Sequence, residues 1–180
     1  MIESVGEPAI DGLAGDVGGL VPLRASTRLQ VDAASVVAAL TGAGAGWLSG
    51  ATELESVNGL RRFAVDLRFR VGPGSISRLT FRKAALLDIG TPWRGGGGWV
   101  AEIGWRASGA APLFPVFSGQ LKIGPVQLRI DGLYAPPGGS LGRIADRVLL
   151  HIAAQATASW LLDEVNRVVD SPARERSDVV

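Results

Sequence analysis

The side chains that could carry out acid–base chemistry are few in this sequence. His151 is the only histidine and Tyr134 the only tyrosine, and each can donate or accept a proton. Glu102 is a third candidate, within a segment of alternating apolar and polar residues. General acid–base catalysis needs a partner group at hydrogen-bonding distance, and no Ser/His/Asp arrangement at a telling spacing is present. We therefore assign no catalytic residue, and we interpret His151 as a structural residue on a helix surface or against a sheet.

Metal and cofactor chemistry has little support in the sequence. The chain contains no cysteine, which excludes disulfides, thiolate metal sites and cysteine nucleophiles, and fits a reducing compartment. Residues 91–98 end in four glycines but lack the Gly-Lys-Ser/Thr of a phosphate-binding loop. We predict a flexible hairpin loop there, whose Trp93 could gate a cavity or contact a partner. No cofactor and no metal ion is predicted.

Length and charge narrow the function classes further. A chain of 180 residues suits one domain. The net charge of +1 offers no charge imbalance that would favour nucleic acid or an anionic membrane. No apolar stretch approaches the ~20 residues that span a bilayer, and the first residues are acidic rather than a secretory signal. We predict a cytoplasmic protein without a nucleic-acid partner or membrane contact; the sequence does not predict its oligomeric state.

The two ends of the chain differ from its middle. Residues 1–22 are rich in glycine, proline and small side chains without a sustained period, which predicts a flexible N-terminal arm. Residues 171–180 are polar and are predicted to be a disordered tail. One folded domain over 23–170 remains between them.

Strands dominate the first two thirds of this domain. The clearest is 62–71, where apolar and mostly charged residues alternate strictly. Its apolar positions are Phe63, Val65, Leu67, Phe69 and Val71. Further strands are predicted at 25–31, 77–89, 99–107, 116–123 and 126–134. A short helix over 33–40, behind the N-cap Asp32, and a helical turn at Trp47 follow the first strand. Strands that are apolar on one face only need another element to cover that face.

The last third of the chain supplies that cover. A long helix is predicted from a cap at Ser140 to about Val169. We predict its apolar stripe at Leu141, Ala145, Val148, Ile152 and Ala156, with Arg143, Arg147 and Ala154 on the far side. The order of elements predicts an α+β fold. In it, a curved antiparallel sheet of six to seven strands wraps around the C-terminal helix, with short helices after the first strand.

A motif near the C-terminus is similar to that of a known superfamily. A strand ends in Gly-x-Tyr, a Pro-Pro-x-Gly turn follows, and a helix opens with Leu-Gly-x-x-x-Asp-Arg. The matching residues are Gly132, Tyr134, Pro136, Pro137, Gly142, Asp146, Arg147 and His151. The pattern resembles the SRPBCC, START and Bet v 1-like superfamily, in its small actinobacterial-type members, over roughly residues 25–169. The resemblance implies a helix-grip fold with a cavity. Its members include lipid carriers, cyclases and hormone receptors, so it implies no single activity.

The resemblance and the apolar strand faces together predict that a small hydrophobic molecule, such as a lipid or polyketide, is bound without catalysis. It would lie in a cavity between the sheet and the C-terminal helix. The predicted ligand-binding residues are Leu67, Phe69, Phe81, Trp105, Leu128, Ile130, Tyr134, Val148 and Ile152. The same residues could instead fill a core, which predicts a structural or interaction protein.

The first alternative to ligand binding, ahead of the structural or interaction protein, is a cyclase- or hydratase-like enzyme on the same scaffold. Its acid–base group would be Glu102, Tyr134 or His151. If one strand had the opposite phase, Glu102 or Arg106 would point into the cavity as a polar anchor. Asp146 and Arg147 are predicted to pair locally or to hold the Pro-Pro turn in place rather than to contact a ligand.

Overall fold

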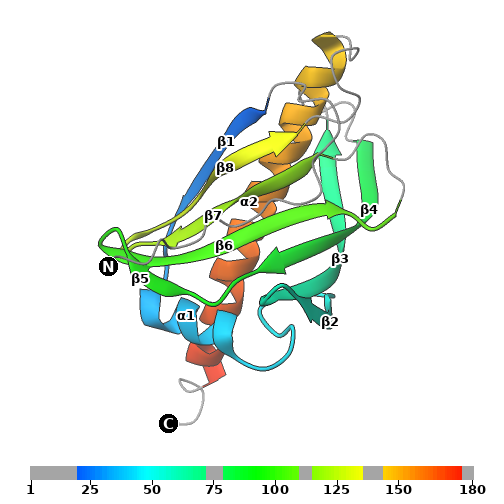
Figure 1. Ribbon diagram of the computed structural model, residues 1–180. Helices are drawn as coiled ribbons and strands as arrows, with labels where there is room; N and C mark the ends of the chain where they lie inside the picture. The colour runs from blue at the N-terminus through cyan, green and yellow to red at the C-terminus, as the bar shows by residue number, and fades with distance from the viewer. Residues whose placement is uncertain (1–19, 72–78, 110–114, 136–143, 176–180) are drawn as a thin grey trace, which may run out of the picture.

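The computed structural model describes residues 20–71, 79–109, 115–135 and 144–175, with side chains over 20–67, 84–109, 115–135 and 151–167. Figure 1 shows a sheet wrapped along one long helix. The elements in chain order are β1 (Val21–Arg28), α1 (Ala33–Thr41), β2 (Thr52–Val57), β3 (Leu60–Val71), β4 (Leu79–Ile89), β5 (Trp93–Gly95), β6 (Gly98–Ala107), β7 (Val116–Ile123), β8 (Gln127–Ala135) and α2 (Ile144–Glu175).

All strands of the described residues belong to one antiparallel sheet. Its order is β1-β8-β7-β6-β4-β3-β2, and β5 pairs with β6 beside this path. The backbone of α2 approaches β1 and β8 on one flank of the sheet and β3 on the other. The sheet therefore curves around the helix (Figure 1). The predicted α+β helix-grip architecture is confirmed. The sheet has eight strands rather than six or seven, because β2 and β5 are short and lack a clear apolar alternation.

The short helix α1 is held at both ends by side chains. At its start, Asp32 accepts a hydrogen bond from the backbone N–H of Ser35 at 2.9 Å, as the predicted N-cap requires. At its end, Arg61 of β3 donates to the carbonyl oxygens of Leu40 at 2.6 Å and Gly44 at 2.9 Å. Because the last carbonyls of a helix lack partners within it, this arginine both completes α1 and ties it to the sheet.

The ends of the domain extend beyond the predicted boundaries. β1 begins at Val21, inside the region predicted as an arm. Pro22 is tolerated there because β1 is an edge strand, paired only with β8. At the other end, α2 continues to Glu175, past the predicted stop near Val169 and into the predicted tail. Its last residues, 173–175, are of types with good helix propensity.

The glycine-rich segment 91–98 lies in a hairpin, as predicted, but residues 93–95 form the strand β5 rather than part of the loop. Gly96 and Gly97 have φ angles of 60° and 82°, which suit a two-residue hairpin turn. The turn joins β5 to β6, with Trp93 opposite Val100. Trp93 remains 42% exposed.

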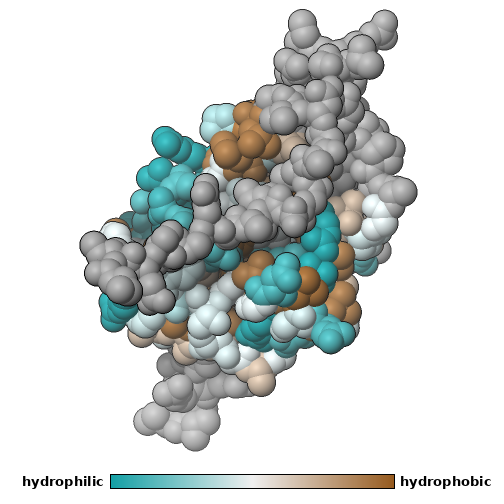
Figure 2. All heavy atoms as spheres, in the orientation of Figure 1, coloured by the Kyte–Doolittle hydropathy of each residue, from teal (hydrophilic) through white to brown (hydrophobic). Residues whose placement is uncertain are grey.

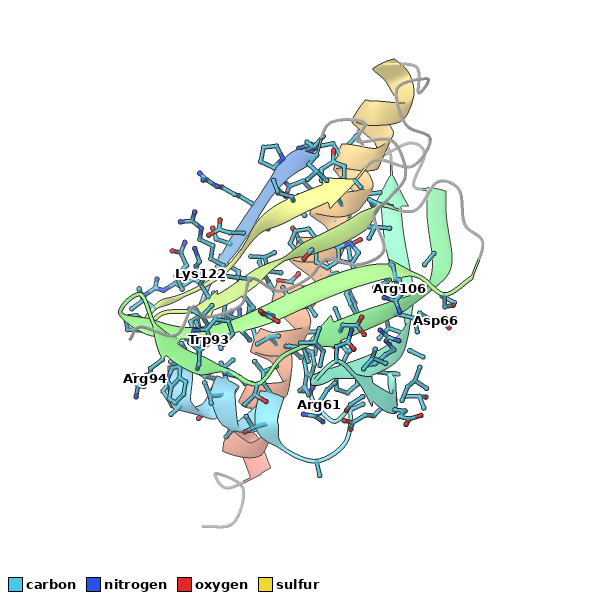
Figure 3. All side chains as sticks on the ribbon, viewed as in Figure 1. Arg61, Asp66, Trp93, Arg94, Arg106 and Lys122 are labelled. Atoms are coloured by element: carbon cyan, nitrogen blue, oxygen red, sulfur yellow. The ribbon has the colours of Figure 1, made fainter. Side chains whose placement is uncertain are left out.

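The sheet face turned away from α2 carries ion pairs. Asp88 of β4 accepts hydrogen bonds from Arg62 at 2.6 Å and from Arg106 at 3.4 Å. Arg106 and Lys122 lie on this face in Figure 3. Glu102 is exposed on the same strand face as Arg106. The alternative in which Glu102 or Arg106 points inward is therefore wrong, and β6 has the phase that its apolar alternation predicts.

A second ion-pair cluster on this face centres on Asp131 of β8. Arg129 and Lys122 lie 2.8 and 3.1 Å from its carboxylate, and Arg24 lies 3.6 Å away. Burial raises the pKa of this carboxyl, but the hydrogen bonds from Arg129 and Lys122 outweigh it, so the pKa lies below the ordinary 3.8. Figure 2 shows apolar side chains beside these charged ones, near the end of β8, where Leu133 is 45% exposed.

The depressed pKa of Asp131 predicts a loss of stability in acid. A group whose pKa is lower in the folded state stabilises the protein above its unfolded pKa, and this contribution disappears as the pH falls through the folded pKa. We expect Asp131→Asn to remove a contribution of about 1 kcal/mol or less at pH 6. At pH 3, below the ordinary value of 3.8, the difference between the variant and the wild type should be smaller than at pH 6. Urea denaturation at both pH values measures this difference, and a gap that is as large in acid as at pH 6 would contradict it.

Candidate functional site

The inner face of the sheet carries one continuous row of large side chains. Cross-strand pairing aligns Phe63 of β3, Leu87 of β4, Trp105 of β6, Phe117 of β7 and Tyr134 of β8. All five side chains are at most 2% exposed. Since alternate residues of a strand share one face, the row continues the period-2 pattern of each strand across the whole sheet. Its apolar surface faces α2.

A pair of glycines shapes the centre of this row. Gly119 and Gly132 are register partners on β7 and β8. A Cβ atom placed on them would lie 2.7 and 2.6 Å from Cζ of Phe117, so the phenyl ring lies over both glycines. The indole of Trp105 stacks on this ring, with centroids 3.9 Å apart and planes at 15°. This glycine pair was not predicted from the sequence, although glycines inside strands are a recognised sign of close backbone approach.

The part of α2 with described side chains, residues 151–167, presents small side chains to the sheet near His151. The buried residues of this part are Ala154, Thr157, Ala158, Leu161, Leu162, Glu164, Val165 and Asn166. The predicted phase of the stripe is wrong at two described positions, since Ile152 is 40% exposed and Ala154, assigned to the far side, is fully buried. Ala156 is partly buried against the core, as the stripe predicts. The helix is rich in alanine, so apolar residues fit more than one phase. The close approach of α2 to the flanks of the sheet selects the phase with the smaller side chains.

Five of the nine predicted ligand-binding residues are buried and face α2. These are Leu67, Trp105, Leu128, Ile130 and Tyr134. Ile152 does not join them. The side chains of Phe69, Phe81 and Val148 lie outside the described residues, as do those of Asp146 and Arg147 and the turn at 136–143.

Tyr134 and His151 form a polar pair at one end of the aromatic row. The Tyr134 Oη and the His151 Nδ1 are 3.3 Å apart, and the tautomer of the histidine decides which of them donates. Burial raises the pKa of the Tyr134 hydroxyl. His151 is exposed on α2, so the pair connects the apolar interior with solvent. Both residues were candidates from the sequence, but their contact was not predicted.

Two buried indole N–H groups have no hydrogen-bond acceptor among the described residues: Trp47 Nε1 and Trp105 Nε1. Trp47, from the segment after α1, contacts Phe63 edge to face, with ring centroids 5.4 Å apart and planes at 84°. Trp105 lies in the middle of the sheet. Buried N–H groups in native proteins nearly always have a partner, so each of these needs an explanation.

The C-terminal half of α2 carries buried polar side chains that fasten it to the domain. Glu164 accepts a hydrogen bond from the backbone N–H of Ser49 at 3.3 Å and pairs with Arg167. Asn166 donates to the carbonyl of Arg28 at 3.0 Å, at the end of β1. These hydrogen bonds satisfy both side chains and attach the helix to β1 and to the segment after α1, which indicates a structural role.

Metal binding finds no support in the described part of the chain, where no cluster of three or more Asp, Glu or His side chains could hold an ion. Among the described helices, none combines the length and the apolar character that crossing a bilayer requires.

Comparison with known proteins defines the fold. No family model matches the sequence, and no curated protein is significantly similar to it. Among solved structures, the Zhui aromatase/cyclase from Streptomyces sp. R1128 aligns with a TM-score of 0.54 and 12% identity, over 84% of this chain and 94% of that one. The di-domain ARO/CYC protein BexL, from the BE-7585A biosynthetic pathway, aligns with a TM-score of 0.52 and 11% identity. That alignment covers 83% of this chain and 50% of BexL.

The chain has the helix-grip fold. A STAR-related lipid transfer protein from Xanthomonas axonopodis also aligns, with a TM-score of 0.45 and 17% identity over 83% of this chain and 85% of that one. The two alignments with TM-scores above 0.5, at 11–12% identity, show a shared fold and leave activity open. In this helix-grip protein the residues with functional potential are the aromatic row, the Trp105 N–H group and the Tyr134–His151 pair.

Proposed function

We propose that this protein binds a small, mainly hydrophobic molecule, such as a lipid or polyketide, between its sheet and α2, without transforming it. The observation that carries the proposal is the position of α2 relative to the sheet. The helix is held at the two flanks of the sheet, while the large apolar side chains of the central strands face it. A concave apolar surface of this kind is the usual basis of small-molecule binding.

The small side chains of α2 support this proposal. Ala154 and Ala158 lie on the buried face of the helix, on the side that begins at His151. Short side chains at these positions occupy less of the space between the helix and the inner face of the sheet. The absence of cysteine suits a reducing compartment, and we place this function in the cytoplasm.

Binding requires side chains to move. Leu87, Trp105, Phe117 and Tyr134 are all nearly inaccessible to solvent, so they fill the interior in this conformation. A ligand that stabilises a minor, more open conformation can populate it by binding that conformation more tightly. The Tyr134–His151 end is the place for this opening, because there a buried residue contacts an exposed one.

Native mass spectrometry of the purified protein, with thermal unfolding in the presence of 2-ethylnaphthalene and of a lipid extract, tests this function. A bound molecule should appear as a mass adduct and should raise the midpoint of unfolding. At a ligand concentration one hundred times Kd, the expected stabilisation is about 2.7 kcal/mol. If no molecule binds and none stabilises the protein, the interior is a filled core, and the structural or interaction role is correct instead.

The Tyr134–His151 pair favours a second candidate function, cyclase-like acid–base catalysis. A tyrosine hydroxyl inside the apolar interior could exchange a proton with a substrate oxygen, and His151 could exchange that proton with solvent. A suitable probe is 2,6-heptanedione. Its terminal methyl carbon loses a proton and attacks the distant carbonyl carbon, which becomes an alcohol. Loss of one water then gives 3-methylcyclohex-2-enone.

The variant Tyr134→Phe separates the two candidate functions. It keeps the aromatic ring and removes only the hydroxyl group that contacts His151. Under the catalytic proposal, protein-dependent formation of 3-methylcyclohex-2-enone should fall by about 100-fold or more. Under the binding proposal, no such activity exists in the wild type, and the affinity for 2-ethylnaphthalene should be unchanged. The product is measured by chromatography and the affinity by equilibrium dialysis.

A further inference from the structure

Trp105 combines burial with an unused hydrogen-bond donor at the centre of the inner sheet face. The residue is 2% exposed, and its Nε1 has no acceptor among the described residues. An unpaired buried N–H group is unfavourable, because it loses its hydrogen bonds to water and gains none in return. Because buried donors in native proteins nearly always have a hydrogen-bond acceptor, this N–H group needs one that the described residues do not supply.

The stacking geometry excludes Phe117 as that acceptor. The indole N–H bond lies in the plane of the indole ring, and this plane is nearly parallel to the phenyl ring, at 15°. The N–H bond therefore runs alongside the face of Phe117 rather than toward it. Trp47 differs, because its ring is perpendicular to Phe63. That arrangement permits a weak N–H···π contact.

The surroundings of Trp105 specify the chemistry of the missing partner. The other four residues of the aromatic row are uncharged. Leu87 and Phe117 are the register partners of Trp105, and Phe63 and Tyr134 lie one strand farther on each side. An ionised carboxylate would lose its hydration here without meeting a cation of this row, whereas a neutral oxygen needs only one donor. The indole N–H is a donor only, so its partner must be an acceptor.

We propose that the ligand carries a neutral hydrogen-bond acceptor, such as a ketone, ester or quinone oxygen, and that the Trp105 N–H group binds it. This inference rests on the proposed binding function and specifies its ligand class. Tyr134 lies two strands away in the same row, about 10 Å from Trp105 between Cα atoms. A ligand with a second oxygen could in addition accept a hydrogen bond from the Tyr134 hydroxyl.

A pair of matched probes tests the inference. The compounds 2-acetylnaphthalene and 2-ethylnaphthalene share a skeleton and differ in one group, a carbonyl in place of a methylene. Equilibrium dialysis measures both affinities for the wild type and for Trp105→Phe, which removes the N–H group and keeps an aromatic ring. We expect the substitution to lower the affinity ratio of ketone to hydrocarbon by about fivefold.

The outcomes of this experiment distinguish the inference from the proposed function. If both probes bind and the ratio is the same in the two proteins, the Trp105 acceptor site is wrong and the binding function remains. If neither probe and no component of the lipid extract binds the wild type, both proposals are overturned.

A measurement on the wild type keeps the inference testable if Trp105→Phe does not fold. The chain has five tryptophans, so a two-dimensional ¹⁵N–¹H spectrum contains five indole N–H signals. The Trp105 signal should shift downfield with 2-acetylnaphthalene and much less with 2-ethylnaphthalene. The Trp47 signal is the matched control, because it is also buried and lacks an acceptor among the described residues. Equal shifts of the Trp105 signal with the two probes would overturn the proposal.

Discussion

Replacing Gly132 with alanine should lower the free energy of unfolding by about 3 kcal/mol, at the upper end of what overpacking usually costs. An added Cβ atom would collide with the backbone carbonyl of Ser118 on β7, and it would lie 2.6 Å from Cζ of Phe117. Backbone in the middle of a sheet cannot yield locally, because its hydrogen bonds fix the spacing of the strands. The cost comes from this steric conflict.

Urea denaturation followed by circular dichroism measures this effect. Gly46→Ala is the matched control, since a Cβ atom at Gly46 would have no neighbour within 4 Å and this residue has no positive φ angle. The control should change the stability by about 0.5 kcal/mol or less, or raise it slightly by restricting the unfolded chain. Equal effects of the two substitutions would show that Gly132 is not needed for close approach of β7 and β8.

Truncating Phe117 to alanine should cost about 3 to 5 kcal/mol. The side chain is 2% exposed, stacks against Trp105 and covers the glycine pair, so its removal leaves a space that the surrounding sheet cannot close. Chemical denaturation again provides the measurement. Val116→Ala, at the neighbouring residue on the opposite face of β7, is the control, and it should cost about 0.5 kcal/mol or less because Val116 is 42% exposed.

Combining the two substitutions tests the cause of the first effect. If part of the cost of Gly132→Ala arises from the phenyl ring, that cost should be smaller when Phe117 is already alanine. The part due to the Ser118 carbonyl should remain. Strictly additive costs would show that the ring gives way freely and that only the backbone conflict matters.

The free energy that holds the aromatic row together matters for the proposed function, because ligand binding has to work against it. The aromatic row is closed in this conformation, and a ligand must open it. The ion pairs of the outer face and the buried polar groups of Glu164 and Asn166 keep the sheet and the C-terminal half of α2 in place. Opening can therefore be confined to the end near Tyr134 and His151, where α2 carries smaller side chains.

The strand faces of this protein could be predicted from the sequence because they depend on a local rule. Side chains alternate along a strand, so Phe63, Val65 and Leu67 share a face wherever the strand lies, and the same holds for Ala101, Ile103 and Trp105. The N-cap at Asp32 was predictable for the same reason, since its partner Ser35 is three residues away. The long C-terminal helix and the helix-grip architecture followed from the order of these elements.

The phase of α2 could not be predicted in the same way. In an alanine-rich helix the apolar residues fit more than one stripe, and the contact with β1, β3 and β8 decides between them. Ile152 is therefore exposed while Ala154 is buried. The strands β2 and β5 were also missed, because neither has a strong apolar alternation of its own, and each forms by pairing with a neighbour.

By itself, the sequence determined which side chains lie together on each strand, and that the apolar faces need a helix to cover them. The tertiary structure decided which residues meet across strands: the row from Phe63 to Tyr134, the glycine pair under Phe117, and the contact of Tyr134 with His151. The physical reason is that alternation along a strand is set by backbone geometry within a few residues. Register and helix placement instead depend on many weak contacts between segments far apart in the chain.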